Sequence, residues 1–150
     1  MRVVIQRVSE ASVTIEGSIY SAIKSGLLIL VGIEIDDNVE DAEWLAKKII
    51  SLRIFSDQEG KMNLNINQIN GDVLIISQFT LFAQTKKGNR PSYIRSARPE
   101  QAIPLYEKFI ALLTSELGKE IHTGIFGADM KVYLINDGPV TILIDSKHKE

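Results

Sequence analysis

The hydrophobic pattern of the first third of the chain predicts several strands. Residues 3–8 and 12–16 carry β-branched side chains, alternating with polar ones in the second stretch, whereas residues 27–33 form one continuous apolar run. Alternation is typical of a half-buried strand, and a continuous run is typical of a strand covered on both faces. We therefore expect a buried central strand at 27–33, paired across a short turn with a companion at 19–23.

Two segments have the spacing of amphipathic helices. Apolar residues between 39 and 52 recur at helical intervals, and Asn38 precedes them as an N-cap. The second helix begins near Pro99 or is reset at Pro104, because proline is tolerated only in a first turn, and Gly118 ends it.

The remaining elements are short strands, and their arrangement indicates the fold class. We expect them at residues 53–55, near Leu64, and at 73–82, 130–135 and 140–144, with a frayed tail at 146–150. The chain has no internal repeat and no linker, which predicts a single domain over residues 1–150. About eight strands and two long helices without regular alternation predict an α+β fold with a curved, largely antiparallel sheet or barrel.

Composition limits the classes of function. The 150 residues are 45% hydrophobic, contain no cysteine and carry a net charge of −2. No apolar run approaches the roughly 20 residues of a membrane helix, and no secretory signal opens the chain. Without cysteine there is no thiolate nucleophile or thiolate metal site, and the pattern favours a cytoplasmic protein. The near-neutral charge argues against a broadly cationic binder of nucleic acid.

One local segment departs from that charge balance. Residues 86–98 contain no acidic residue and the following basic ones: Lys86, Lys87, Arg90, Arg95 and Arg98. Glycine, asparagine and proline in the same stretch indicate a loop. Tyr93 lies among the charges, where an aromatic ring can stack on an unpaired base. The segment is either a solvated basic loop or a contact for a phosphate backbone.

The stretch 73–82 carries the most informative polar residues. It opens as a buried strand and then places Ser77, Gln78 and Thr80 in what should be core. Burying a hydroxyl or amide without a partner costs about 1–3 kcal/mol, so these groups are either bonded internally or presented to a ligand. Ser77 and Thr80 face opposite sides of a regular strand, so the strand must end, twist or bulge if both serve one site.

The usual hydrolytic machinery cannot be assembled from this sequence. His122 and His148 are the only histidines, so a Ser-His-Asp triad is not expected, and neither zinc ligands at suitable spacing nor a phosphate-binding glycine loop occur. We expect no metal and no cofactor. An enzyme of this composition would rely on hydroxyls, backbone amides and the substrate's own groups, which suits an activated ester.

Two motifs resemble the signatures of a known family. Ser77-Gln78-Phe79-Thr80-Leu81 and Asn136-Asp137-Gly138-Pro139-Val140-Thr141 resemble the two signature motifs of the D-aminoacyl-tRNA deacylases. The stretches 4–8, 53–57, 60–64 and 90–92 are also similar to that family, and neither signature shows a departure. From composition alone, the Asn-Asp-Gly-Pro segment is typical of an ordinary hairpin turn.

The resemblance implies the fold of that family and a homodimeric hydrolase. The enzyme would cleave the ester that joins a D-amino acid to the terminal adenosine of tRNA, and it would also remove glycine, including glycine mischarged on alanine tRNA. Gly138 and Pro139 of the partner chain, with the proline in cis, would complete each active site. Their main-chain carbonyls would hold the amino group and fill the volume that an L side chain needs.

The resemblance also implies roles for other residues. The catalytic wall would comprise Ser77, Gln78, Phe79 and Thr80, with an oxyanion hole at the amides around the last two, and Thr80 would position the substrate because no base activates it. Supporting or substrate-binding roles fall to Arg7, Met130, Asn136, Val140 and Thr141, and tRNA contacts to Lys86, Lys87, Arg90 and Arg95. From the residues themselves, Arg7 could equally be a surface arginine and Met130 part of the core.

Two competing functions use the same residues differently. One is a noncatalytic tRNA- or DNA-binding module that uses the basic loop 86–98, which predicts binding without turnover. The other is a hydrolase of free D-amino-acid esters or peptides, which predicts activity without RNA.

Overall fold

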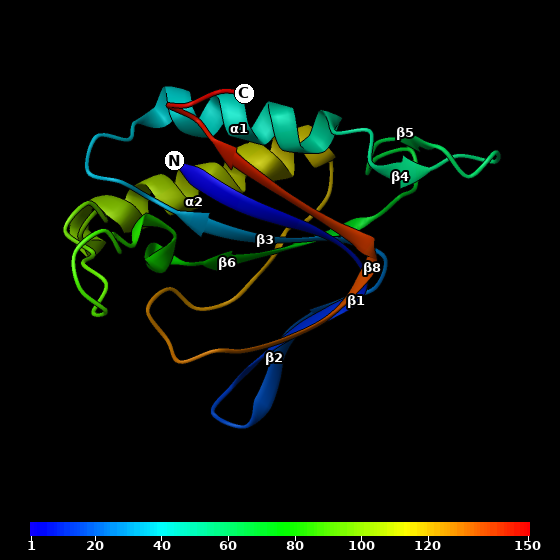
Figure 1. Ribbon diagram of the computed structural model, residues 1–150. Helices are drawn as coiled ribbons and strands as arrows, with labels where there is room; N and C mark the ends of the chain where they lie inside the picture. Colours follow the sequence, from blue (N-terminus) through cyan, green and yellow to red (C-terminus); the bar gives the residue numbers. More distant parts are fainter.

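The computed structural model describes residues 1–150, and its sheet is organised around one long strand. The strands of the sheet are β1 (Arg2–Ile15), β2 (Ser18–Ile23), β3 (Gly26–Gly32), β6 (Asp72–Ser77), β7 (His122–Thr123) and β8 (Lys131–Asp145). β1 pairs antiparallel with β3 along its first half, with β2 along its second half, and with β8 along most of its length. The sheet continues in parallel from β3 to β6 and β7. Figure 1 shows it turning strongly along β1.

A side-chain contact nearly closes this curved sheet. The Ser21 hydroxyl on β2 donates a hydrogen bond of 2.7 Å to the Thr123 carbonyl on β7, at the other end of the strand order. A separate small hairpin, β4 (Phe55–Ser56) with β5 (Met62–Leu64), projects from the sheet (Figure 1). The predicted α+β class with a curved, largely antiparallel sheet is therefore confirmed, with the parallel β3–β6–β7 pairs as the exception.

Both faces of the central strands are buried, as the continuous apolar runs predict. On β6, Val73 and Ile75 belong to the main core beneath the helices, whereas Leu74 and Ile76 belong to a smaller core on the other face. Side chains alternate across a strand, so Ser77 continues the helix-facing row and Gln78 the opposite row. The position of these two polar residues at the end of β6 places them at the edge of both cores.

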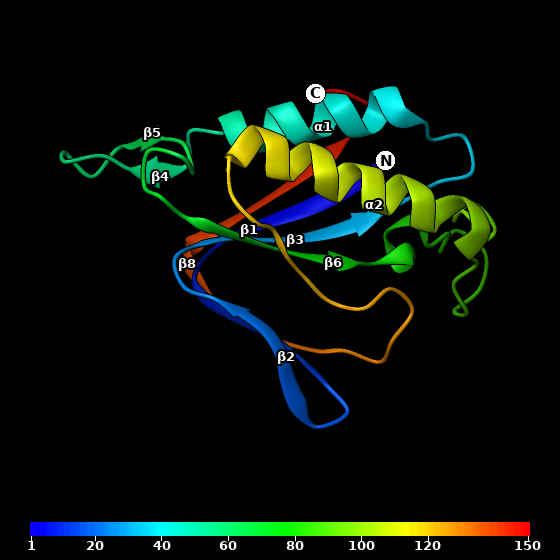
Figure 2. The same cartoon turned by 180° about the vertical axis from the view of Figure 1, so that it is seen from behind.

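Two helices cover one face of the sheet, side by side (Figures 1 and 2). α1 (Val39–Ser51) begins with a capping box, in which the Asn38 side chain accepts from the amides of Glu40 and Asp41 and the Asp41 carboxylate accepts from the Asn38 amide. α2 (Pro99–Leu117) starts with proline and ends at Gly118 in the left-handed conformation. Both predicted helices are confirmed, and Pro104 lies inside the second one.

Two strand predictions at the start of the chain are wrong. Residues 3–8 and 12–16 form the single strand β1, and residues 19–23 pair with β1 instead of with 27–33. The reason lies at the turn: Glu16 and Gly17 both have positive φ, which is typical of a two-residue hairpin loop. This loop folds β2 back onto β1.

The two predicted C-terminal strands are also one strand. Both halves of β8 pair with β1, residues 131–136 beside its second half and 141–145 beside its first. Residues 136–139 are therefore a bulge within a continuous strand, and the hairpin interpretation is wrong. A hairpin would pair the two halves with each other, but here the longer β1 offers a partner to each, with its register shifting around Arg7 and Ser9.

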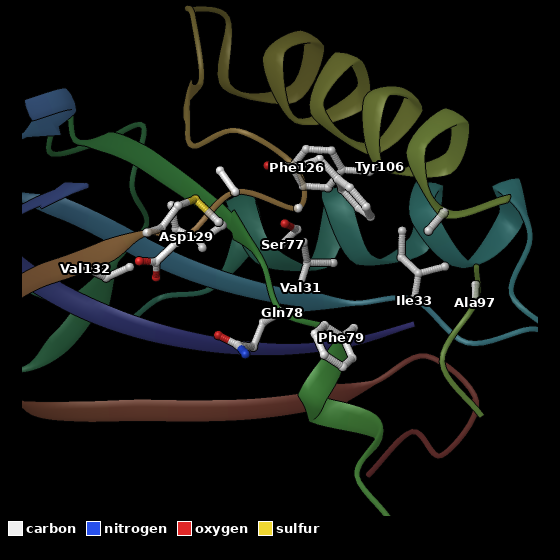
Figure 3. Close-up of a pocket in the computed structure, with 15 residues that line it drawn as sticks. Val31, Ile33, Ser77, Gln78, Phe79, Ala97, Tyr106, Phe126, Asp129 and Val132 are labelled. Atoms are coloured by element: carbon white, nitrogen blue, oxygen red, sulfur yellow. The ribbon is translucent and has the colours of Figure 1, made fainter. Parts of the chain in front are cut away.

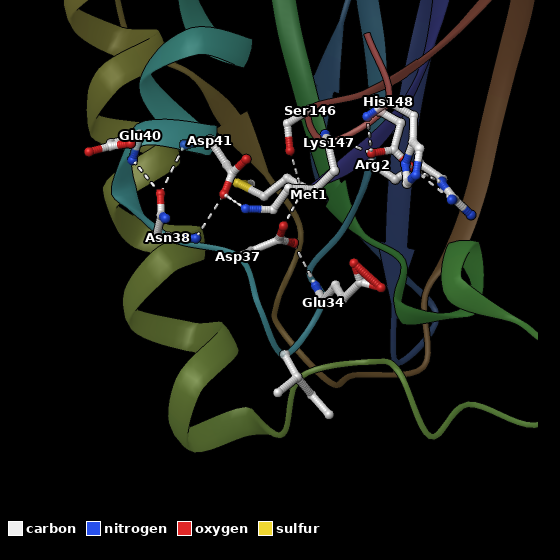
Figure 4. Close-up of polar contacts among 12 residues, drawn as sticks. Met1, Arg2, Glu34, Asp37, Asn38, Glu40, Asp41, Ser146, Lys147 and His148 are labelled. Carbon is white, nitrogen blue, oxygen red and sulfur yellow. Dashed lines mark hydrogen bonds and ion pairs between the residues drawn. The ribbon is translucent and has the colours of Figure 1, made fainter.

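The C-terminal tail is anchored where fraying was expected to begin. The buried Met1 ammonium donates to the Ser146 hydroxyl at 2.6 Å and to the Asp37 carboxylate (Figure 4). The Lys147 ammonium pairs with Asp41 at 2.7 Å, next to the start of α1. Ser146 and Lys147 therefore join both ends of the chain to the first helix, and the expectation of a frayed tail from residue 146 is wrong for these two residues.

Candidate active site

A mainly apolar pocket of about 300 Å³ lies between the carboxyl end of β6 and α2. Its walls are Val31, Ile33, Ile76, Ser77, Gln78, Phe79, Ala97, Ala102, Tyr106, Phe126, Gly127, Ala128, Asp129, Met130 and Val132. Figure 3 shows Tyr106 and Phe126 on the side of α2, and Gln78 and Phe79 at the end of β6. An apolar cavity with a few convergent polar groups is the usual form of a small-ligand site.

The strand predicted over residues 73–82 is shorter than expected, and ending is one of the three outcomes that would let Ser77 and Thr80 serve one site. β6 stops at Ser77, and a 3₁₀ turn, η1 (Phe79–Phe82), follows directly. The first N–H groups of a 3₁₀ turn have no hydrogen-bond acceptor within the turn. The Phe79 and Thr80 amides are therefore available to a ligand. The abrupt change from strand to turn thus brings hydroxyls and free amides to one place, as an oxyanion hole requires.

Thr80 is held by its neighbour. The Gln78 side-chain amide donates to the Thr80 hydroxyl oxygen at 2.5 Å. Because that oxygen accepts this bond, its own proton can be directed to another acceptor. Neither histidine lines the pocket, and the carboxylate that does, Asp129, is ion-paired with Lys131. The Thr80 hydroxyl is hydrogen-bonded to Gln78 and to no histidine or carboxylate, so no general base contacts it.

The far wall contains residues that the sequence did not single out. Tyr106 and Phe126 pack edge to face with ring centroids 5.7 Å apart. The Tyr106 hydroxyl donates to the Ile75 carbonyl, and burial raises its pKa far above the ordinary 10.0, so it remains a protonated structural donor. Sequence alone assigns Tyr106 to the apolar face of a helix, and Phe126 lies in an irregular segment, so neither carried a functional signal.

Met130 lies in this wall and depends on a glycine opposite. A Cβ built on Gly124 would lie 2.4 Å from the Met130 sulphur and 3.2 Å from Ile76 Cδ1. Gly124 therefore leaves the space that the Met130 side chain occupies. Met130 both lines the pocket and packs against the smaller core, so its placement fits both of the roles that the sequence left open.

The second motif forms a rigid protrusion from β8. The Gly138–Pro139 peptide bond is cis, and both residues are exposed. Asn136 bridges the base of the bulge, because its Oδ1 accepts from the Val140 amide at 2.7 Å and its Nδ2 donates to the Val140 carbonyl and the Thr141 hydroxyl, each at 3.1 Å. Asn136, Val140 and Thr141 thus hold the turn in place.

Arg7 supports the same turn from below. Its Nε donates to the Asp137 main-chain carbonyl at 2.8 Å, and its Nη1 donates to the Ile54 carbonyl at 2.6 Å. The Arg7 side chain is only 11% exposed, so it is not the surface arginine that the sequence left open. It links the protruding turn to the body of the chain.

The two motifs do not meet within one chain. Ser77, Gln78 and Phe79 line the pocket and Thr80 joins them through Gln78, but neither Gly138 nor Pro139 contributes to its walls. The pocket therefore has no group from the second motif, and the exposed Gly138–Pro139 turn does not reach the pocket of its own chain.

The predicted basic residues divide into two kinds. Lys86, Lys87 and Arg90 are exposed and make no ion pair. Arg95 pairs with Glu34 and lies 5.6 Å from the centre of the Phe82 ring, so it is engaged within the chain. No cluster of three potential metal ligands forms, and no helix has the length and apolar character needed to span a bilayer.

Comparison with known proteins decides the family. The sequence model described as D-Tyr-tRNA(Tyr) deacylase matches residues 4–145. The chain belongs to the D-aminoacyl-tRNA deacylase family. A relative from Flavobacterium psychrophilum, named D-aminoacyl-tRNA deacylase, is 65% identical over 150 residues, which is 100% of both chains. The family resemblance of the two motifs is thereby confirmed, and the family is one of hydrolases.

Two solved structures share the fold of this deacylase family member. One, named c-Myc DNA Unwinding Element Binding Protein, has a TM-score of 0.89 and 39% identity, and the match covers 97% of this chain and 98% of the other. The other, a probable eukaryotic D-amino acid tRNA deacylase, has a TM-score of 0.81 at 15% identity, covering 95% and 97%. At that identity the second match supports the fold alone.

Proposed function

We propose that the chain hydrolyses the ester bond of D-aminoacyl-tRNA as a homodimer, in which the Gly138–Pro139 turn of each protomer completes the pocket of the other. One observation carries the proposal: the pocket lacks the second motif, while the turn that carries it is exposed and firmly braced. In a two-fold dimer each chain can place its exposed turn at the pocket of the other, so both pockets gain the second motif at once.

The edge of the sheet is suited to such a dimer. β8 pairs only with β1, so its other edge is free along the strand, and Tyr133, Ile135 and Leu143 on it are exposed. A long free edge with apolar side chains favours association with another chain.

The pocket suits the terminal aminoacyl-adenosine. Tyr106, Phe126 and Met130 offer apolar and aromatic surface to the adenine, and we assign the Phe79 and Thr80 amides to polarise the ester carbonyl. Water attacks the carbonyl carbon, the tetrahedral oxyanion is stabilised by these amides, and the ribose oxygen leaves with a proton. The 2′-hydroxyl of the tRNA is the group we assign to orient the water, since the pocket has no histidine.

Chirality is read by exclusion at the partner's turn. The turn's main-chain carbonyls would accept hydrogen bonds from the substrate's amino group and occupy the side on which an L side chain projects. A D side chain points away from them, and glycine has none, so glycyl-tRNA should also be cleaved.

Release of amino acid from D-tyrosyl-tRNA and L-tyrosyl-tRNA tests the activity. Wild-type protein should release only the D form, Thr80→Ala should lose most of its activity, and Pro139→Ala should lose activity or discrimination. A folded protein that releases neither form would contradict the proposal. Trapping of an acyl group on Thr80 would contradict its role as a positioning residue.

Mixed dimers test whether the turn acts on the partner. If it does, a dimer of one Thr80→Ala chain and one Pro139→Ala chain has one site with both native residues. Random pairing makes half of the dimers mixed, with one intact site in two, so D-specific release should recover to about one quarter of the wild-type rate. Activity equal to the average of the two parent variants would show that the turn acts within its own chain.

A noncatalytic nucleic-acid role is a second candidate. The exposed Lys86, Lys87 and Arg90 favour it, as does the likeness to a structure named for DNA binding. It predicts that duplex DNA binds with unchanged affinity to Thr80→Ala, and that affinity falls when Lys86 and Lys87 are replaced.

A further inference from the structure

An exposed aromatic pair continues the pocket outward. Phe79 lines the pocket yet is 55% exposed, and its ring meets that of Tyr93 edge to face at 5.0 Å and 73°. Tyr93 is 38% exposed and Ile94 is 74% exposed. Large apolar side chains at a pocket mouth are costly to leave in water unless a ligand covers them.

Tyr93 is held in place before any ligand arrives. Gln84 and Ser92 exchange backbone hydrogen bonds of 2.8 and 3.0 Å directly before it. Three residues after it, the Ser96 amide donates to the Tyr93 carbonyl and the Ser96 hydroxyl donates to the Phe79 carbonyl, each at 2.9 Å. The ring is therefore presented at the pocket mouth by a segment that is fixed on both sides, which lowers the entropic cost of binding.

A polar cleft adjoins Tyr93 through the preceding residue, Ser92. It is lined by Gln84, Thr85, Lys86, Lys87 and Ser92, without any apolar residue. The two lysines make no ion pair, and no acidic residue occurs from 86 to 98. An apolar pocket, an aromatic ring and a basic cleft thus follow one another along the surface. Binding sites for single-stranded nucleic acid combine these stacking and basic surfaces.

We propose that Tyr93 stacks on the base that precedes the terminal adenosine of the tRNA, and that the cleft of Lys86 and Lys87 binds the phosphates further along the same single strand. The proposal rests on the proposed function and adds the path of the RNA outside the pocket. A polyanion is the occupant that this cleft favours by charge, because its lining has two lysines and no carboxylate.

The test compares D-tyrosyl-tRNA with D-tyrosyl-adenosine, which has the reacting group but no preceding nucleotide. Loss of one stacked base should lower kcat/KM of Tyr93→Ala on the tRNA by about 5- to 150-fold and leave the nucleoside unaffected. Tyr93→Phe should restore most of the tRNA activity, because it keeps the ring. Met62→Ala, which truncates an exposed apolar residue of the β4–β5 hairpin, is the matched control.

Each failure has a distinct meaning. If Tyr93→Ala lowers activity on both substrates equally, or on neither, the stacking role is wrong while the deacylase activity stands. A shift of Tyr93→Ala to another oligomeric state in sedimentation would instead make this surface an interface between copies. If wild-type protein cleaves neither substrate, the proposed function and this path both fail.

Salt dependence tests the phosphate contacts separately. Replacing both Lys86 and Lys87 by alanine should make the slope of log affinity for tRNA against log salt less steep by about 1.4, at about 0.7 for each single-strand contact. Lys47→Ala, on the exposed side of α1, is the matched control and should leave the slope unchanged. An unchanged slope in the double variant would remove the phosphates from this cleft.

Discussion

Arg7→Met tests how the second motif is held. Methionine replaces the aliphatic part of the arginine side chain but lacks the guanidinium, so the substitution removes the two charged hydrogen bonds to the Ile54 and Asp137 carbonyls. Ile54 is buried, so its carbonyl loses its partner without gaining water, whereas the Asp137 side chain is 59% exposed and its carbonyl can be rehydrated. One buried orphan acceptor costs about 1–3 kcal/mol, and the lost charged bond at the turn adds to it.

We therefore expect Arg7→Met to lower the free energy of unfolding by about 2–4 kcal/mol. For a chain of this size that corresponds to a fall in Tm of roughly 4–16 °C. The released turn should also reject L-tyrosyl-tRNA less well, so the ratio of D to L release should fall at a temperature where the variant is folded. Calorimetry and the deacylation assay measure the two effects.

Asp137→Asn is the matched control. The carboxylate lies 3.4 Å from Arg7 Nε and is largely exposed, so this ion pair should contribute less than about 1 kcal/mol. Because Arg7 bonds the main-chain carbonyl, the control should keep both stability and discrimination. If Asp137→Asn is as impaired as Arg7→Met, the important contact of Arg7 is the Asp137 carboxylate and not its main-chain carbonyl. If Arg7→Met is destabilised but discriminates between D and L substrates as well as wild type, Arg7 contributes to stability and not to chiral recognition.

Three further substitutions have defined outcomes. Burial alone would raise the pKa of Asp145, but hydrogen bonds from Arg2 and from two backbone amides outweigh it and hold the pKa below 3.8. The ionised carboxylate therefore stabilises the fold at neutral pH, and this contribution is lost as the pH falls below 3.8. In thermal melts, wild type should be more stable than Asp145→Asn at neutral pH, and the difference should disappear in acid. Gly124→Ala should displace the Met130 sulphur and raise KM for D-aminoacyl-tRNA more than it lowers kcat. A Cβ on Gly26 would lie 1.9 Å from a main-chain oxygen of β6, so Gly26→Ala should cost about 3–5 kcal/mol in urea unfolding.

Local chemistry made some elements predictable from sequence. Asn38 with an acidic first turn, and Pro99 with Gly118, mark helix ends through contacts within a few residues, and both helices are where these residues place them. The polar end of β6 was only partly predictable, because hydroxyls after a buried run are either bonded internally or presented to a ligand, and the strand expected to reach residue 82 ends at Ser77. These signals depend only on near neighbours in the chain.

Long-range pairing was not predictable in the same way. Residues 136–139 have turn composition, and only the presence of β1 beside both flanking segments makes them a bulge. Similarly, Arg7 is recognisable as an unusual charge on a buried strand, but its acceptors at Ile54 and Asp137 are 47 and 130 residues away. Tyr106 and Phe126 enter the pocket through packing of α2 and an irregular segment, which no periodicity describes.

The continuity of β8 has a consequence for accuracy. Because the strand pairs with β1 on both sides of residues 136–139, the protruding turn has no hinge of its own. It moves only when the bonds from Arg7 and Asn136 or the flanking β1–β8 ladder open. In the proposed mechanism, errors in chiral recognition then depend on the opening of these contacts and not on a hinge. A substitution far from the pocket that destabilises the β1–β8 ladder would then lower the ratio of D to L release. On heating, the release of L-amino acid should increase in proportion to the fraction of molecules in which the ladder is open.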